Sequence, residues 1–249
     1  MPVHWQEIFK KLESGEIRSA TKENGKWVPN IEVKESILEA FSEGELSLME
    51  ACYIDKHNLT PRVFEPADEV RIVPFGSTVR RGTYVSRGVI IMPPSYINIG
   101  AFVDKGTLVD SHVLIGSCAQ VGKNVHLAAG VKLGGVLEPV GLSPVVIEDN
   151  CFVGAGSIIV EGVHVYKNSV IAPGVVLSRS VPVYDAVHQR LLKKGEPIPE
   201  NSVVIPGSRN LKNENDFTRA HGLKLSCAII IKYRDEKSDA SLVLEEALR

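Results

Sequence analysis

Aliphatic residues recur every six positions through the middle of this chain. The series is interrupted once, and its members are Val79, Val85, Ile91, Ile97, Val103, Val109, Ile115, Val121, Leu127, Leu133, Ile147, Val153, Ile159, Val165, Ile171 and Leu177. Four residues after most of them stands a second, mostly small residue, such as Thr83, Ala119 or Ser157. Helical faces recur about every 3.6 residues and strand faces about every two. Neither element alone explains a repeat of six.

This period is typical of a parallel β-helix, in which each hexapeptide forms a short strand and a turn. The aliphatic residue then points into a narrow core, and the small residue fills the corner beside it. Three hexapeptides close one triangular coil, so the repeats predict roughly five stacked coils. The period does not define the handedness of the coils, although crossovers between parallel strands are right-handed in most proteins.

Composition adds limits on the class of protein. The chain has 249 residues, a net charge of −2 and 44% hydrophobic residues, which suits a core domain with smaller flanking parts. The near-neutral charge favours neither nucleic-acid nor membrane partners. The four cysteines form no CxxC pair, and no apolar stretch resembles a signal peptide or could span a bilayer. We therefore expect a cytoplasmic protein with reduced thiols.

An α-rich cap is expected before the repeats, over residues 1–70. Apolar residues at i, i+3, i+4 and i+7 from Trp5 predict an amphipathic helix over 2–14. The pair Asn24-Gly25 predicts a hairpin turn. A second apolar stripe, from Val33 to Phe41, predicts another helix.

The coils should occupy residues 71–182, and an extension should follow over 183–249. In the extension, the polar stretch LLKKGEPIPE predicts a surface loop, LSCAIIIKY (225–233) a strand and SLVLEEALR (241–249) a helix. The extension is long enough to reach a neighbouring subunit. The predicted fold class is thus mainly β.

The interruption between Leu133 and Ile147 spans fourteen residues, two more than a multiple of six. An insertion in a solenoid must leave the coil surface, so GGVLEPVGLSPVV predicts a projecting loop over 134–146. A neutral insertion is the alternative.

The chain resembles the tetrahydrodipicolinate N-succinyltransferase family. The resemblance is carried by AFVDKGTLVDSHVLIGSCAQVGKNVHLAAGVKLGGVLEP and SPVVIEDNCFVGAGS, and it extends to ESGEIRSATKENGKWVPN, VRIVPFGSTVRRGTYVSRGVIIMPPSYINIG and LSCAIIIK. It implies a left-handed β-helix and a homotrimer with active sites between adjacent subunits. It also implies transfer of succinyl from succinyl-CoA to the amine of ring-opened tetrahydrodipicolinate, in lysine and diaminopimelate biosynthesis. No metal or covalent acyl-enzyme is implied, so positioning and oxyanion stabilisation would carry the catalysis.

The resemblance also suggests residues for the substrate. A dicarboxylate needs a bidentate guanidinium, and Arg71 in VRIVP matches the substrate-binding arginine of the family; a solvated arginine is the alternative. Asp110 directly follows the core residue Val109 and should face outward, where the family places an acid on the substrate amine. Its alternative role is turn formation, which we expect of Asp104. Gly135 and Glu138 are the other substrate-binding candidates.

His126 precedes a core leucine, should also face outward, and is a candidate general base; an interface histidine is the alternative. Coenzyme A needs a groove with accessible backbone, which small residues permit. The candidates for it are Gly134, Gly154, Ala155, Gly156 and Gly174, with Lys167 and Arg179 for the phosphates. Turn glycines and solvated charges are the alternatives.

Three residues depart from the family pattern. Ile158 stands where a glutamate is expected, Pro182 where an arginine is common, and His112 where a tryptophan is expected. An acetyl-CoA-dependent N-acetyltransferase and a noncatalytic scaffold therefore stay open. A zinc enzyme would need three converging histidines; the repeats offer His112, His126 and His164 without a close pair, and no metal is expected.

Overall fold

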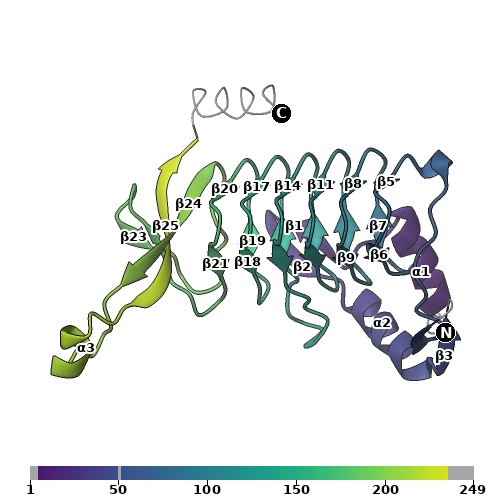
Figure 1. Cartoon of the computed structure of the whole chain (residues 1–249), viewed down its shortest axis with the longest axis horizontal. Coiled ribbons are helices and arrows are strands. Elements are labelled where there is room, and N and C mark those ends of the chain that lie inside the picture. The colour runs from purple at the N-terminus through teal and green to yellow at the C-terminus, as the bar shows by residue number, and fades with distance from the viewer. Residues whose placement is uncertain (1–4, 50–51, 235–249) are drawn as a thin grey trace.

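The repeats form a left-handed parallel β-helix (Figure 1). The computed structural model describes residues 5–49 and 52–234. Each hexapeptide gives a strand of two residues, and three strands close a coil. None of the sixteen aliphatic residues of the repeat is more than 5% exposed, because all of them point into the core. The predicted fold class is confirmed.

The coils have three faces, each a parallel sheet in register. The cap face consists of β7 (Tyr84–Val85), β10 (Phe102–Val103), β13 (Gln120–Val121), β16 (Val146–Ile147) and β19 (His164–Val165). The extension face starts with β5 (Arg71–Ile72), β8 (Ile90–Ile91), β11 (Leu108–Val109), β14 (His126–Leu127), β17 (Phe152–Val153) and β20 (Val170–Ile171). The third face consists of β6 (Thr78–Val79), β9 (Tyr96–Ile97), β12 (Leu114–Ile115), β15 (Lys132–Leu133), β18 (Ile158–Ile159) and β21 (Val176–Leu177).

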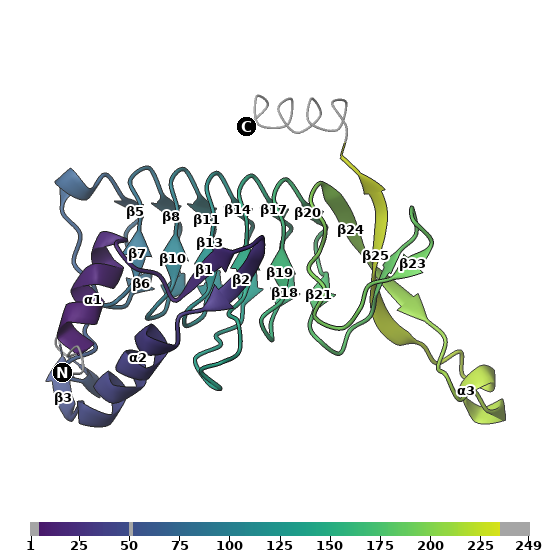
Figure 2. The same ribbon diagram turned by 180° about the vertical axis from the view of Figure 1, so that it is seen from behind.

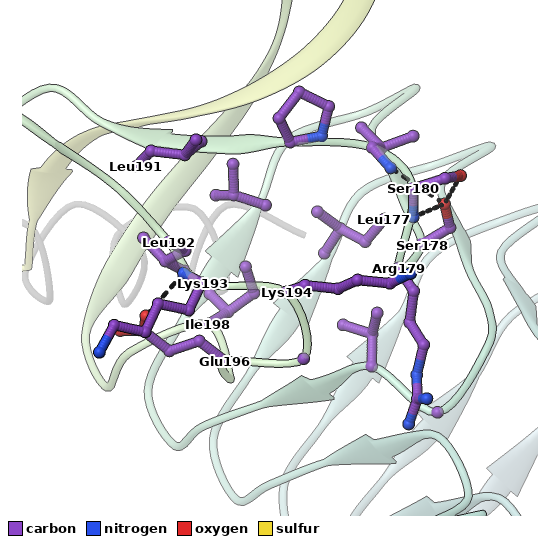
Figure 3. Close-up of a pocket in the computed structure, with 16 residues that line it drawn as sticks. Leu177, Ser178, Arg179, Ser180, Leu191, Leu192, Lys193, Lys194, Glu196 and Ile198 are labelled. Carbon is purple, nitrogen blue, oxygen red and sulfur yellow. Dashed lines mark hydrogen bonds between the residues drawn. The ribbon is translucent and has the colours of Figure 1, made fainter.

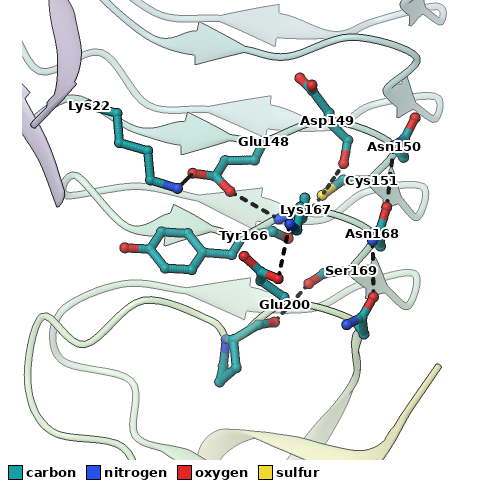
Figure 4. Close-up of polar contacts among 12 residues, drawn as sticks. Lys22, Glu148, Asp149, Asn150, Cys151, Tyr166, Lys167, Asn168, Ser169 and Glu200 are labelled. Atoms are coloured by element: carbon teal, nitrogen blue, oxygen red, sulfur yellow. Dashed lines mark hydrogen bonds and ion pairs between the residues drawn. The ribbon is translucent and has the colours of Figure 1, made fainter. Parts of the chain in front are cut away.

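The edge between the cap face and the extension face carries a ladder of asparagines, and we call it the asparagine edge. Asn124, Asn150 and Asn168 adopt φ of 52°, 58° and 60°, a left-handed turn that asparagine tolerates better than most residues. Their side-chain amides donate along the stack, from Asn124 to Asn150 at 3.2 Å, from Asn150 to Asn168 at 3.3 Å and from Asn168 to Asn201 at 3.0 Å. Figure 4 shows the bond between Asn150 and Asn168. The ladder ties successive coils together outside the core.

The cap contains more strand than the sequence suggests. Its elements are α1 (Trp5–Ser14), β1 (Ala20–Glu23), β2 (Lys26–Pro29), α2 (Ile31–Glu43), β3 (Leu46–Met49), β4 (Tyr53–Lys56) and the 3-10 helix η1 (Pro66–Asp68). Both predicted helices and the hairpin at Asn24-Gly25 are present, and residues 2–4 of the first helix lie outside the described residues. The hairpin β3–β4 was not predicted, because Leu46 and Leu48 are about three-quarters exposed and bury little.

The cap lies across the cap face, as Figure 2 shows for the hairpin β1–β2. The Arg18 guanidinium stacks 3.6 Å from the ring centre of Phe102 and donates from Nε to Gln120 Oε1 at 2.9 Å. Further along the stack, the Glu148 carboxylate accepts hydrogen bonds from Lys22 Nζ at 2.6 Å and from Trp27 Nε1 at 2.8 Å. These contacts join the cap to several coils at once.

The extension closes the far end of the core. Its elements are β22 (Val183–Asp185), β23 (Arg190–Leu191), β24 (Ser202–Arg209), α3 (Asp216–Ala220) and β25 (Leu225–Tyr233). β24 pairs in parallel with β20 and thus continues the extension face. Ile198, Val204 and Ile230 are buried over the last coil. The ribbon β24–β25 then runs away from the stack, with α3 at its tip (Figure 1).

The strand predicted over 225–233 is confirmed as β25, whereas the helix predicted over 241–249 lies outside the described residues. All four cysteines are free thiols, and three of them are buried. Among the residues placed in the structure, no helix has the length and apolar character needed to cross a bilayer.

Candidate active site

The edge between the extension face and the third face carries Asp110, and we call it the Asp110 edge. Its next turns, one coil apart, are the small-residue segments 128–130, 154–156 and 172–174. Adjacent coils are about 4.8 Å apart, so Asp110 and Gly154 are separated by about 10 Å along the stack. The structure therefore brings Asp110, Gly154, Ala155, Gly156 and Gly174 together on one edge.

Asp110 is half-buried and faces outward. Its Oδ1 accepts a hydrogen bond from Ser111 N at 2.7 Å, and within the described residues Oδ2 accepts none. Asp104 forms the same bond with Lys105 N at 2.7 Å, but it lies on the asparagine edge. Turn formation is thus common to both aspartates, and only Asp110 adjoins the small-residue turns.

His126 lies on the extension face, one coil beyond Leu108 and next to Phe152. Its ring meets the Phe152 ring edge-on, with 5.1 Å between the ring centres. The side chain is half-buried, whereas its neighbour Leu127 is fully buried. Arg71 is exposed at the start of the same face, in β5.

The loop between β15 and β16 covers residues 134–145, since Val146 already belongs to β16. It leaves the edge between the third face and the cap face, which we call the loop edge. A Cβ on Gly134 would lie 2.8 Å from Val160 Cγ1, and one on Gly135 would lie 2.8 Å from Ser117 N. Both glycines therefore pack closely against neighbouring coils of the same chain.

The loop projects less than its sequence suggests. Val136 is buried and donates from N to Ser117 O at 3.1 Å. Leu137 packs against the core of the cap. Glu138, Pro139 and Gly141 are exposed, and they form the tip of the loop.

One chain does not bring all predicted site residues together. Glu138 lies on the loop edge and Asp110 on the Asp110 edge. Lys167 lies on the asparagine edge, where its Nζ is 3.4 Å from Glu200 Oε2 (Figure 4). A signal for this separation exists in the sequence, since residues on one edge are eighteen positions apart, or twenty-six across the loop. This spacing alone predicts that Glu138, Lys167 and Asp110 lie on different edges.

Arg179 lines a cavity of about 210 Å³ between the last coil and the extension (Figure 3). Leu177 and Leu192 form apolar parts of its wall, and Lys193 and Lys194 add two cations. Sequence reasoning placed these lysines in a surface loop. Only the return of the chain over the last coil brings them near Arg179.

The three histidines of the zinc alternative do not converge. His112 lies on the Asp110 edge, His126 on the extension face and His164 on the cap face. Burial lowers the pKa of His164 to about 4, and its Nε2 lies 2.9 Å from Ser143 Oγ in the loop. Across residues 5–49 and 52–234, no group of three or more metal-ligating side chains is found.

The departures from the family pattern occupy different surroundings. Ile158 is half-buried on the third face, between Lys132 and Val176 of the neighbouring coils. His112 adopts φ of 62°, in a turn position that Gly130 and Gly156 fill in later coils. Pro182 lines the cavity beside Arg179.

Comparison with known proteins gives consistent names. A family model described as the hexapeptide repeat of succinyl-transferase matches residues 144–179. A protein of Albidiferax ferrireducens is 45% identical over 252 residues, which cover 98% of this chain and 88% of the relative. A protein of Legionella pneumophila is 43% identical over 250 residues, with 98% and 87% covered. Both are named 2,3,4,5-tetrahydropyridine-2,6-dicarboxylate N-succinyltransferase.

A solved structure supports the fold. It is a crystal structure from Campylobacter jejuni, described as a 2,3,4,5-tetrahydropyridine-2-carboxylate N-succinyltransferase, with a TM-score of 0.58 and 16% identity. The match covers 92% of this chain and 63% of that one.

Proposed function

The chain belongs to the 2,3,4,5-tetrahydropyridine-2,6-dicarboxylate N-succinyltransferase family, and from this membership we propose that it transfers succinyl from succinyl-CoA to ring-opened tetrahydrodipicolinate. The observation that carries the proposal is the 45% identity over 98% of the chain. The proposed setting is lysine and diaminopimelate biosynthesis in the cytoplasm. Four free cysteines support a reducing compartment.

In the proposed reaction, the substrate amine attacks the thioester carbonyl carbon directly. The C–N bond forms, the C–S bond breaks, coenzyme A leaves as the thiol, and the amine loses one proton. Asp110 orients the amine and is our first candidate for accepting this proton, with His126 on the adjoining face as the second. The reaction written in this way requires no metal ion.

Binding of the dicarboxylate is assigned to the exposed Arg71 guanidinium and to the loop 134–145, through Gly135 and Glu138. An arginine holds a carboxylate through two parallel hydrogen bonds. The small-residue turns of the Asp110 edge suit the pantetheine arm, because exposed backbone is accessible there. Gly156 and Gly174 support this, since a Cβ on either would meet no heavy atom within 4 Å.

We further propose a homotrimer whose active sites form between subunits. The loop edge and the Asp110 edge lie on opposite sides of the third face, so a neighbouring chain could place its loop tip beside Asp110 where the same chain does not. The cationic cavity of Arg179, Lys193 and Lys194 suits the phosphates of coenzyme A. Gly134, Gly154 and Lys167 are weaker candidates, because packing or an ion pair within the chain accounts for each.

An acetyl donor is the second candidate, because Ile158 stands where the resembled succinyltransferases have a glutamate, and the related tetrahydrodipicolinate N-acetyltransferases lack that glutamate as well. Thiol release from succinyl-CoA and from acetyl-CoA, each with tetrahydrodipicolinate and with simple amino acids, distinguishes the two. We expect a higher kcat/KM with succinyl-CoA and tetrahydrodipicolinate than with any other pair. A preference for acetyl-CoA would overturn the donor, and no release with either donor would favour a noncatalytic scaffold.

A further inference from the structure

A fully buried lysine of the cap contacts the loop 134–145. Lys34 lies on α2, is 0% exposed, and donates from Nζ to the backbone carbonyl of Leu142 at 2.5 Å. The two residues are 108 positions apart. A buried ammonium is costly unless its hydrogen bonds compensate for the lost water.

The surroundings of Lys34 offer little other compensation. Burial lowers the pKa of its ammonium, and the nearby Cys118 opposes this shift. Cys118 is itself buried, and burial raises the pKa of its thiol to about 11, so it stays uncharged near neutral pH. Among the described residues, no carboxylate lies within ion-pair distance of Lys34. A methionine would fill a similar volume without this cost, so packing alone does not explain the lysine.

The Leu142 carbonyl that Lys34 binds lies where the loop turns back from its exposed tip towards the coils. Val136 N fixes the first limb of the loop to Ser117 O at 3.1 Å. Leu142, which also donates from N to Pro139 O at 2.9 Å, begins the second limb. The exposed tip, which carries Glu138, lies between these two hydrogen-bonded residues, Val136 and Leu142.

From this geometry we infer that Lys34 is a positioning residue for the acyl transfer, acting through Leu142 to hold the loop tip in its working place. The inference rests on the proposed function, in which Gly135 and Glu138 of this loop bind the substrate. Lys34 itself touches neither substrate nor coenzyme. A displacement of about 1 Å of a binding group can lower a rate about 100-fold.

The test compares Lys34→Met and Lys34→Arg in the full-length enzyme, with Lys10→Met as a control at an exposed lysine of α1. We expect Lys34→Met to lower kcat/KM for the amine substrate about 10- to 100-fold and to change KM for succinyl-CoA less than twofold. Lys34→Arg should recover part of the loss, because it keeps a buried donor. Lys10→Met should match the wild type.

Hydrogen exchange supplies the second measurement. In Lys34→Met, the amides of Val136 and Leu142 should exchange at least tenfold faster, while Gly116, whose amide donates to Leu133 O within the coils, should not change. A purely structural lysine would instead accelerate exchange throughout α2. If Lys34→Met does not fold, Lys34→Gln, which keeps a neutral donor, undergoes the same two measurements.

Normal kinetics in Lys34→Met, or unchanged exchange at Val136 and Leu142, would overturn the inference. So would an equal loss for both substrates together with a global loss of stability. The result that would overturn the proposed function is distinct from these, because the wild-type enzyme itself would then release no thiol. The exchange experiment needs no substrate and would still report whether Lys34 holds the loop.

Discussion

At the scale of single residues, Asp110 and Asp104 occupy equivalent positions in consecutive turns, and we propose a role in the reaction for Asp110 alone. Asp110 and Asp104 make the same hydrogen bond to the next backbone N–H, each at 2.7 Å. Only Asp110 lies on the edge that carries the small-residue turns. A substitution that keeps the shape of the side chain therefore tests the charge and leaves the turn in place.

We predict that Asp110→Asn lowers kcat by about 100-fold or more, the range typical of a lost acid–base group, and that Asp104→Asn stays within about twofold of the wild type. Thiol release at saturating substrate measures both, and thermal unfolding checks that both variants fold. Similar turnover in the two variants would remove Asp110 from the reaction.

The outward direction of Asp110 and His126 could be predicted from the sequence, because each adjoins an aliphatic residue of the repeat. The role of Lys34 could not. Its position in the helical stripe of α2 gives no sign that its partner is a carbonyl 108 residues later. Such a contact depends on two separate elements docking on the same coil.

At the scale of elements, one carboxylate joins three strands of the extension. Asp185 in β22 is 1% exposed, and its Oδ2 accepts hydrogen bonds from His188 Nδ1 and from Tyr233 OH of β25, both at 2.8 Å. Arg190 Nε of β23 lies 3.5 Å from the same oxygen. Burial alone would raise the pKa of Asp185, but the hydrogen bonds from His188 and Tyr233 outweigh it and hold the pKa at about 2.

The resulting pH dependence has a defined sign. Because the folded pKa lies below the ordinary value of 3.8, the carboxylate stabilises the fold fully above about pH 5, and this contribution is lost as the pH falls through 4 towards 2. We predict that Asp185→Asn lowers the free energy of unfolding by about 2 kcal/mol at pH 7 and by much less near pH 2. Urea unfolding of both proteins across this range measures the difference. A difference that does not change with pH would contradict the assignment.

Regular elements were predictable because their periods are local. The strand at 225–233 was predicted with its observed bounds, and the sixteen repeat positions placed every coil strand except β5, which precedes the first of them. The interruption located the loop, but its two limbs pack on Ser117 and on α2. These contacts join residues that are far apart in the sequence, so the local pattern that reveals a turn or an insertion does not predict them.

At the scale of the whole molecule, the separation of the candidate residues over different edges predicts an assembly. A single chain carries a loop edge and an Asp110 edge that face different directions, so the site that we propose requires two chains. We predict a trimer with three times the chain mass of 27.1 kDa, measured by light scattering after size exclusion. Full activity in a monomeric species would contradict the shared site.

A complementation experiment gives the sharper form of this prediction. Asp110→Asn and a variant with a shortened loop tip should each be nearly inactive alone, and mixed trimers should regain part of the activity. Only sites that combine an intact Asp110 from one chain with an intact loop from its neighbour can supply that activity. Absence of any recovery in verified mixed trimers would place both parts within one chain.

The docking of the cap also has a consequence for protein synthesis. Arg18 and Lys22 are made early, but their partners Gln120 and Glu148 follow 102 and 126 residues later, and Tyr166 reaches Gly25 only after 141 residues. At about 5–20 residues per second, the nascent cap waits on the order of ten seconds for its docking surface. During that interval its inner side is open to chaperones, and the translation of the later coils brings this exposure to an end.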